Sequence, residues 1–230
     1  MSLHCQIERI YLYTRFERFW HWAQAALIGF LVLTGLEVHG LFSFFGFKGA
    51  VDFHNYAGIA WFVLYVFIIF WQLTTGEWKH YIPTTRKLMA VAYYYVYGIF
   101  RGEHHPVPKS ERNKHNPLQR LAYLGISVVL IPVQVATGFL YYTYNSWGQW
   151  GLDFNLATIS LIHTAGAYAL GAFLVGHVYM TTTGHNLVCH IKAMCTGWEE
   201  VQANGHPAMA CEGRQVTDGD CKDAIAGTGA

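Results

Sequence analysis

Charged residues are scarce in this sequence. They make up 13% of its 230 residues, and the formal net charge is +1, whereas soluble proteins carry roughly 25% charged residues. A chain with so little net charge lacks the basic field that nucleic-acid binding requires. The sequence also contains no catalytic triad, no phosphate-binding loop and no nucleotide-binding fingerprint. Its chemistry, if it has any, is therefore expected to come from a cofactor.

Cysteines are few as well, and their spacing is uninformative. None of the five stands in a C-x-x-C-H motif, which excludes covalently attached c-type haem. Their separations match neither the usual zinc sites nor the iron–sulfur sites. We expect free thiols at Cys5, Cys189, Cys195, Cys211 and Cys221.

Hydrophobic residues are abundant, at 53% of the chain, and they gather in four long runs. The runs cover about residues 19–38, 56–73, 121–144 and 156–180, each long enough to cross a hydrocarbon core of about 30 Å as a helix. Pro132 should kink the third helix without ending it, because neighbouring helices can satisfy the freed carbonyl. The first run is followed by no small-residue cleavage site, so we expect a retained span.

These runs predict an all-α fold, an integral membrane four-helix bundle over residues 1–198. A Tyr-rich segment at 84–100 is expected to add an interfacial helix, and residues 199–230 to form a flexible tail. Lys and Arg concentrate before the first run and between the second and third. The positive-inside rule therefore places both termini and the central loop in the cytoplasm. The loops at 40–52 and 145–155 face outward, and their aromatic residues suit either a docking surface or an interfacial belt.

Four histidines lie within or at the edge of these spans, where ionisable side chains are costly and mark function. His21 and His177 fall near the cytoplasmic side, and His54 and His163 near the outer side. His163 and His177 are 14 residues apart, so they face one side of a helix with a rise of roughly 20 Å between them. Two pairs at two depths are what two bis-histidine haems in a four-helix bundle need.

Other interpretations of these histidines remain open. Each could be a buried, hydrogen-bonded side chain, and an intramembrane zinc protein could also use histidines. Zinc, however, needs three or four ligands at one depth. A non-redox membrane anchor for a periplasmic oxidoreductase is a further alternative, although it would not need histidines at matched depths.

The sequence around these histidines resembles the prokaryotic diheme cytochrome b subunits of formate dehydrogenases, nickel-iron hydrogenases and thiosulfate reductases. The stretch Arg18-Phe19-Trp20-His21-Trp22 resembles the family's R-x-x-H-W opening. His54 with Gly58, and His163 with His177, resemble its remaining ligands. Asn116-Pro117-Leu118-Gln119 resembles a segment that borders the quinone. The stretch from Gly184 to Glu200 is most similar to the thiosulfate-reductase-type branch.

The resemblance implies a cytochrome with two b haems that transfers electrons between a quinone, for which we expect menaquinone, and a partner on the outer face. That partner would be a periplasmic oxidoreductase subunit or a multihaem cytochrome c. His21 and His177 would ligate the inner haem, and His54 and His163 the outer one. Asn116 and Gln119 would border the quinone. Arg18 would either pair with a haem propionate or act as a positive-inside anchor, and the direction of electron flow stays open.

Overall fold

The computed structural model describes residues 7–103, 106–107, 115–182 and 188–202. In chain order the elements are β1 (Ile7–Tyr11), α1 (Arg15–Val38), α2 (Phe47–Thr75), the 3₁₀ helix η1 (Glu77–Tyr81), α3 (Leu88–Val96), η2 (Gly98–Arg101), α4 (Pro117–Gly125), the π-helical turn η3 (Ile126–Leu130), α5 (Ile131–Tyr142), η4 (Tyr144–Ser146), α6 (Trp147–Trp150), α7 (Leu156–Thr181), α8 (Cys189–Thr196) and β2 (Trp198–Gln202).

Four helices are long and apolar enough to cross a membrane: Arg15–Val38, Phe47–Thr75, Pro117–Tyr142 and Leu156–Thr181. The third consists of α4, η3 and α5 in one continuous helix. This confirms the all-α membrane bundle. Most of its large apolar side chains are exposed at the surface, as expected of a bundle that lipid surrounds.

The helix α2 begins at Phe47, nine residues before the predicted start at 56, and this corrects the expected outward loop at 40–52. The expected loop included two charged residues, Lys48 and Asp52. They lie one helical turn apart and form a salt bridge of 2.6 Å, so both charges are accommodated within the helix. His54 consequently lies two turns inside α2 instead of at its start.

The third span continues as a helix past Pro132, as predicted, and a π-helical turn at Ile126–Leu130 precedes the proline. The N–H of Ile131 donates to the carbonyl of Ile126, five residues earlier. With this spacing the next donor, for the carbonyl of Ser127, would be the nitrogen of Pro132, which has no hydrogen. The hydroxyl of Tyr65 in α2 donates to that carbonyl at 2.6 Å. A neighbouring helix thus satisfies the carbonyl that the proline leaves free.

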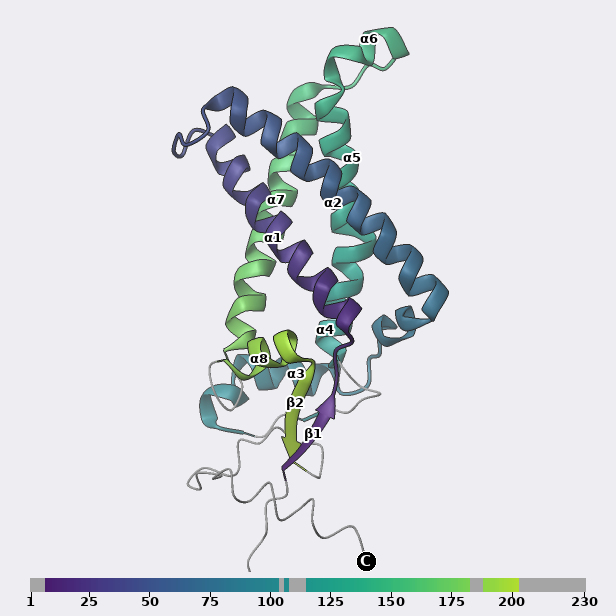
Figure 1. Ribbon diagram of the computed structural model, residues 1–230, viewed down its shortest axis with the longest axis vertical. Helices are drawn as coiled ribbons and strands as arrows, with labels where there is room; N and C mark the ends of the chain where they lie inside the picture. Colours follow the sequence, from purple (N-terminus) through teal and green to yellow (C-terminus); the bar gives the residue numbers. More distant parts are fainter. Residues whose placement is uncertain (1–6, 104–105, 108–114, 183–187, 203–230) are drawn as a thin grey trace, which may run out of the picture.

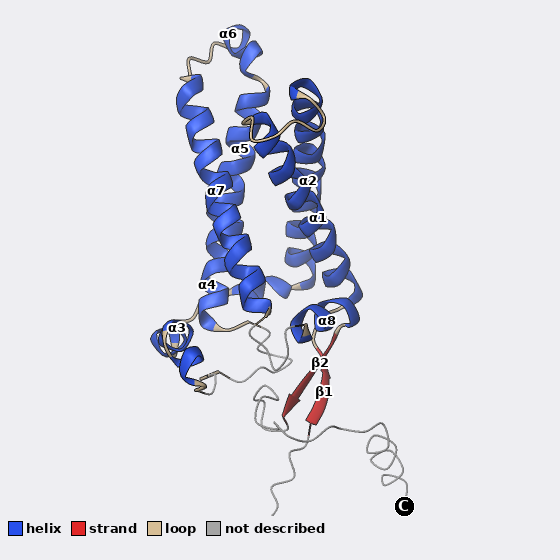
Figure 2. Ribbon diagram, turned by 90° about the vertical axis from the view of Figure 1, so that its left-hand side faces the viewer, coloured by secondary structure: helices blue, strands red, loops and turns tan. Residues whose placement is uncertain are grey.

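The four spans form two pairs. The backbones of α1 and α2 pack closely together, and so do those of α5 and α7, whereas contact between the two pairs is weak. Figure 2 shows α1 with α2 on one side and α7 with α5 on the other. Side chains that reach from one helix pair to the other therefore provide much of the contact between the two pairs.

One end of the bundle, here called the strand end, carries the short antiparallel sheet of β1 and β2 (Figure 1). The other, the loop end, carries residues 39–46 and α6. In the part of the chain that the structure describes, Lys48 is the only Lys or Arg at the loop end. Within the predicted segment 84–100 the structure has the helix α3 at the strand end, with Val91 and Tyr94 as its buried residues. Its position in the membrane interface stays a prediction.

Strand β2 corrects the predicted boundary of the tail. Residues 199–202 belong to this strand and pair with residues 7–10 of β1, while residues 203–230 lie outside the described residues. Sequence patterns missed the sheet because its two strands are short and nearly 190 residues apart. Cys189 and Cys195, in the neighbouring α8, are free thiols, as expected.

Candidate haem-binding site

The four predicted histidines meet in two pairs that bridge the two helix pairs. The ring centres of His21 in α1 and His177 in α7 are 6.1 Å apart. Those of His54 in α2 and His163 in α7 are 6.3 Å apart. Along α7 the two levels are separated by 14 residues, or roughly 21 Å. The structure therefore brings together the residues that the sequence pairs by depth. We call them the strand-end pair and the loop-end pair.

The spacing within each pair fits one metal ion between two imidazoles. An imidazole nitrogen binds a first-row metal at about 2 Å and lies roughly 1 Å from the centre of its ring, so two axial imidazoles have ring centres roughly 6 Å apart. Groups of three or more metal-binding side chains are not found among the described residues. The donor set is thus one of paired neutral imidazoles, the set that a bis-histidine haem uses.

The loop-end pair is held by threonines that the sequence analysis missed. The hydroxyl oxygen of Thr34 lies 2.9 Å from Nδ1 of His54, and that of Thr137 lies 3.1 Å from Nδ1 of His163. Both threonines are buried. The signal that could have revealed them is a Thr-Gly dipeptide in the first and in the third span. Each dipeptide lies in the span that precedes the span of its histidine.

A second side chain at the loop-end pair is Gln134 of α5. Its Nε2 lies 3.3 Å from Nε2 of His163, and its Oε1 is buried without a partner among the described residues. A metal bound at Nε2 of His163 would replace this hydrogen bond. Gln134 therefore has to turn its amide aside when His163 acts as a ligand.

The strand-end pair is framed by aromatic rings. The ring of Phe173 stacks on His177 with centres 5.7 Å apart and planes at 20°, and Trp22 meets His21 edge-on at 5.1 Å. The Nδ1 atom of His21 is buried and has no hydrogen-bond partner among the described residues. The two pairs thus share a ring spacing but differ in their polar surroundings.

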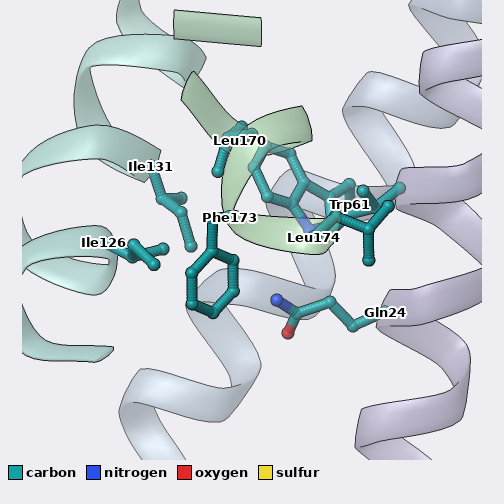
Figure 3. Close-up of a pocket in the computed structure, with 8 residues that line it drawn as sticks. Gln24, Trp61, Ile126, Ile131, Leu170, Phe173 and Leu174 are labelled. Atoms are coloured by element: carbon teal, nitrogen blue, oxygen red, sulfur yellow. The ribbon is translucent and has the colours of Figure 1, made fainter. Parts of the chain in front are cut away.

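A small cavity of about 60 Å³ lies between the two levels. In Figure 3 the ring of Phe173 stands between Gln24 on one side and Ile126 and Ile131 on the other. Trp61 and Leu170 also line the cavity, and each follows the loop-end histidine of its own helix by seven residues. Apolar side chains therefore fill most of the space at half height.

Rings continue from the strand-end pair toward the strand end. Phe173 contacts Tyr123 at 6.2 Å between ring centres, and Tyr123 contacts His115 at 5.1 Å. His115 in turn contacts Tyr81 at 5.2 Å. Burial is the main cause that raises the pKa of Tyr81, so this phenol stays protonated and able to donate a hydrogen bond at neutral pH.

Asn116 and Gln119, the predicted quinone neighbours, form a capping box at the start of α4. The side chain of Asn116 accepts from the N–H of Gln119 at 2.8 Å, and Gln119 accepts from the N–H of Asn116 at 3.0 Å. The Nδ2 of Asn116 also donates to the hydroxyl of Tyr95 at 2.9 Å. Burial raises the pKa of Tyr95 to about 12. Both residues therefore have a structural role, and contact with a quinone stays a prediction.

Arg18 is engaged away from the histidines. Its guanidinium donates to the carbonyl of Cys195 at 2.6 Å, close to the C-terminus of α8, where a positive charge is favourable. The indole of Trp22 donates to the neighbouring carbonyl of Met194 at 3.3 Å. Arg18 thus attaches α8 to α1, and its pairing with a haem propionate stays a prediction.

Known proteins resemble the chain over the segment that contains this site. Residues 12–197 match the model of a family described as prokaryotic cytochrome b561. The chain belongs to this family. Cytochrome YdhU of Escherichia coli (strain K12) is 31% identical over 207 residues, which cover 83% of the chain and 75% of that relative. A Ni/Fe-hydrogenase 1 B-type cytochrome subunit of the same strain is 24% identical over 195 residues, with 74% and 81% covered.

Family membership confirms the resemblance to prokaryotic b-type cytochromes. The protein is a membrane b-type cytochrome that acts in electron transfer, and its cofactor is haem b. The thiosulfate-reductase-type branch stays a prediction. The paired imidazoles of this cytochrome are the residues in the described chain that suit such a cofactor.

Proposed function

We propose that this cytochrome holds two b haems and passes electrons across the membrane between a quinone and a partner oxidoreductase. One observation carries the proposal: two histidine pairs at two levels of one bundle, each with the ring spacing of a bis-histidine metal site. His21 and His177 would hold the strand-end haem, and His54 and His163 the loop-end haem. The haems would supply one-electron redox chemistry.

The chain's own contribution is to position the two ligand pairs and to keep water away from them. Helix α7 supplies one ligand to each pair and so fixes the distance between the levels. Apolar side chains such as Trp61 and Leu170 fill the space between them. The lipid-facing surface excludes water on the outside, which favours electron transfer within the bundle over side reactions with solvent.

We place the strand end in the cytoplasm and the chain in the bacterial inner membrane. The distribution of Lys and Arg supports this orientation, because the described cations other than Lys48 are at the strand end. The loop end then faces the periplasm. Both the strand β1 near the N-terminus and the strand β2 near the C-terminus lie on the cytoplasmic side.

A partner is expected at the loop end. The name of one relative describes it as a subunit that belongs with a Ni/Fe-hydrogenase, and this supports an oxidoreductase partner here. Phe42, Phe44 and Trp150 expose aromatic surface at the loop end, where a periplasmic oxidoreductase subunit or a multihaem cytochrome c would dock.

The quinone, for which we expect menaquinone, is placed near the strand-end pair. The rings of Tyr81, His115 and Tyr123 connect that pair with the strand end. Protonated phenols there could exchange the protons that accompany quinone chemistry. Asn116 and Gln119 border this region through the capping box that fixes the start of α4.

Haem content and absorption spectra test the proposal. The purified protein is expected to hold two b haems per chain and to show b-type bands in a reduced-minus-oxidised spectrum. His177→Ala should remove the strand-end haem and keep the loop-end haem. His54→Ala, in a separate variant, should remove the loop-end haem and keep the strand-end haem. His80→Ala, at a histidine in η1 outside the spans, is the matched control and should keep both haems. One haem per chain, or loss of neither in the two site variants, would contradict the proposal.

A further inference from the structure

The two threonines beside the loop-end pair have the same hydrogen-bond arrangement. Thr34 donates its hydroxyl hydrogen to the carbonyl of Phe30 at 2.9 Å, and Thr137 donates to that of Val133 at 2.7 Å. With the hydrogen used in this way, each oxygen is left to accept. The nitrogen within reach is Nδ1 of His54 in one case and of His163 in the other.

This arrangement matches one tautomer of both imidazoles. With the threonine oxygen as the acceptor, Nδ1 carries the ring hydrogen, and Nε2 keeps the lone pair that a metal binds. His54 and His163 are therefore prepared as Nε2 ligands before any metal is present. The planes of the two rings stand at 79° to each other.

The glycine after each threonine lies against the imidazole. A Cβ atom at position 35 would stand 3.4 Å from Cε1 of His54, and one at position 138 would stand 3.0 Å from Cε1 of His163. The Thr-Gly dipeptides of α1 and α5 thus form two similar contact surfaces, one for each imidazole of the loop-end pair.

The strand-end pair differs in this respect. The Nδ1 atom of His21 is buried and has no hydrogen-bond partner among the described residues. A hydrogen bond from Nδ1–H to an acceptor raises the basicity of the coordinating nitrogen. A more basic ligand stabilises ferric over ferrous iron, and so lowers the reduction potential.

We propose that Thr34 and Thr137 are positioning residues that fix the two ligands of the loop-end haem and lower its reduction potential. The inference rests on the proposed two-haem function. When the loop-end haem has the lower reduction potential, an electron distributed between the two haems favours the strand-end haem. The quinone is proposed to bind at that end.

Redox titration of the two haems in the purified holoprotein tests this inference. Valine keeps the shape of threonine without the hydroxyl, so Thr34→Val and Thr137→Val should each move one of the two haem components to a higher midpoint potential. The double variant should move it further, and Thr34→Ser with Thr137→Ser should restore it. The component that moves should be the one that His54→Ala removes.

Thr74→Val is the matched control. Thr74 in α2 makes the same bond to a carbonyl four residues earlier, that of Phe70 at 2.9 Å, but its hydroxyl has no histidine partner among the described residues. We expect the potentials of this variant to equal those of the unchanged protein. The ferric low-spin EPR signal gives a second readout, because loss of the threonine bonds frees the ring planes and should change the signal of the loop-end haem alone.

Two results would overturn the inference. One is a haem-replete Thr34→Val/Thr137→Val variant with unchanged potentials, and the other is an equal shift of both components. The single variants keep one of the two bonds and are expected to retain both haems, so the measurement stays possible. A protein that binds fewer than two haems before any substitution would instead contradict the proposed function, which separates the two failures.

Discussion

A single carboxylate organises the loop end of the bundle. Glu37 is 4% exposed, and its Oε1 accepts hydrogen bonds from the N–H groups of Phe44, Phe45 and Gly46 at 2.7, 2.7 and 2.8 Å. These amides precede the first turn of α2, where a negative charge is favourable. Glu37 therefore connects the end of α1 to the start of α2, and it fixes the register of Thr34 against His54.

We expect Glu37→Gln to lower the free energy of unfolding by about 2 kcal/mol, because three charge-assisted bonds become bonds to a neutral amide oxygen. Thermal denaturation of the holoprotein in detergent measures the change. Asp52→Asn at the same end is the control. In the part of the chain that the structure describes, Asp52 pairs with the exposed Lys48, and such pairs contribute little. Equal melting temperatures for the two variants would contradict this role of Glu37.

At the scale of elements, the π-helical turn of the third span involves two side chains from different helices. Pro132 removes a backbone donor, and Tyr65 replaces it at the carbonyl of Ser127. We expect Tyr65→Phe to cost about 1 to 2 kcal/mol, since it leaves that carbonyl unsatisfied.

A double-mutant cycle with Pro132→Ala tests the coupling. Alanine restores an N–H to the backbone, so Tyr65→Phe should cost less than half as much in the Pro132→Ala background. Thermal denaturation of the four proteins gives the coupling energy. Tyr168→Phe, at a tyrosine that is 71% exposed, should have no effect in either background. Costs that simply add would show that the two residues act independently.

The contact between α8 and the N-terminal segment depends on Gly197. Its φ is +91°, and a Cβ there would stand 2.7 Å from both the ring of Tyr11 and the carbonyl oxygen of Tyr13. Its own carbonyl accepts from the N–H groups of Leu12 and Tyr13 at 2.9 and 3.2 Å. Only glycine fits this position, because both the backbone conformation and the space exclude a side chain.

Gly197→Ala is expected to release α8 and β2 from the bundle. The strain of a positive φ alone costs about 1 to 2 kcal/mol, and the clash with backbone adds to it. Limited proteolysis should cleave the C-terminal segment faster than in the unchanged protein. Gly102→Ala is the matched control, since Gly102 also has a positive φ, of +69°, but open space around it. Equal cleavage rates in the two variants would mean that the strain of a positive φ explains the whole effect and that the clash at Gly197 adds nothing.

At the scale of the whole molecule, the spans and the two histidine pairs could be predicted because both follow from position along the chain, whereas haem ligation by these histidines stays a prediction. Runs of apolar residues set the spans, and matched depths set the two histidine pairs. The early start of α2 was missed because the charges of Lys48 and Asp52 neutralise each other only once the helix has formed. Thr34 and Thr137 were missed because a Thr-Gly dipeptide in a span indicates a histidine contact only when the facing helix, with its histidine, is known. The sheet of β1 and β2 depends on a contact between the two ends of the chain, which no local pattern encodes.

The division into two helix pairs predicts that haem is part of what holds the bundle together. Contact between the α1–α2 pair and the α5–α7 pair is weak, and the histidine pairs bridge them. Protein produced with limited haem should therefore melt at a lower temperature than the holoprotein. A ligand at 100 times its dissociation constant stabilises the folded state by about 2.7 kcal/mol per site.

Melting curves followed by far-UV circular dichroism measure this contribution. Added hemin should raise the melting temperature of the haem-limited protein, whereas it should leave that of the His21→Ala/His54→Ala variant unchanged, because this variant lacks one ligand in each pair. The comparison separates binding at the two pairs from unspecific binding of hemin to the apolar surface. Equal melting temperatures with and without haem would mean that direct contacts between the helix pairs are sufficient to hold the bundle together.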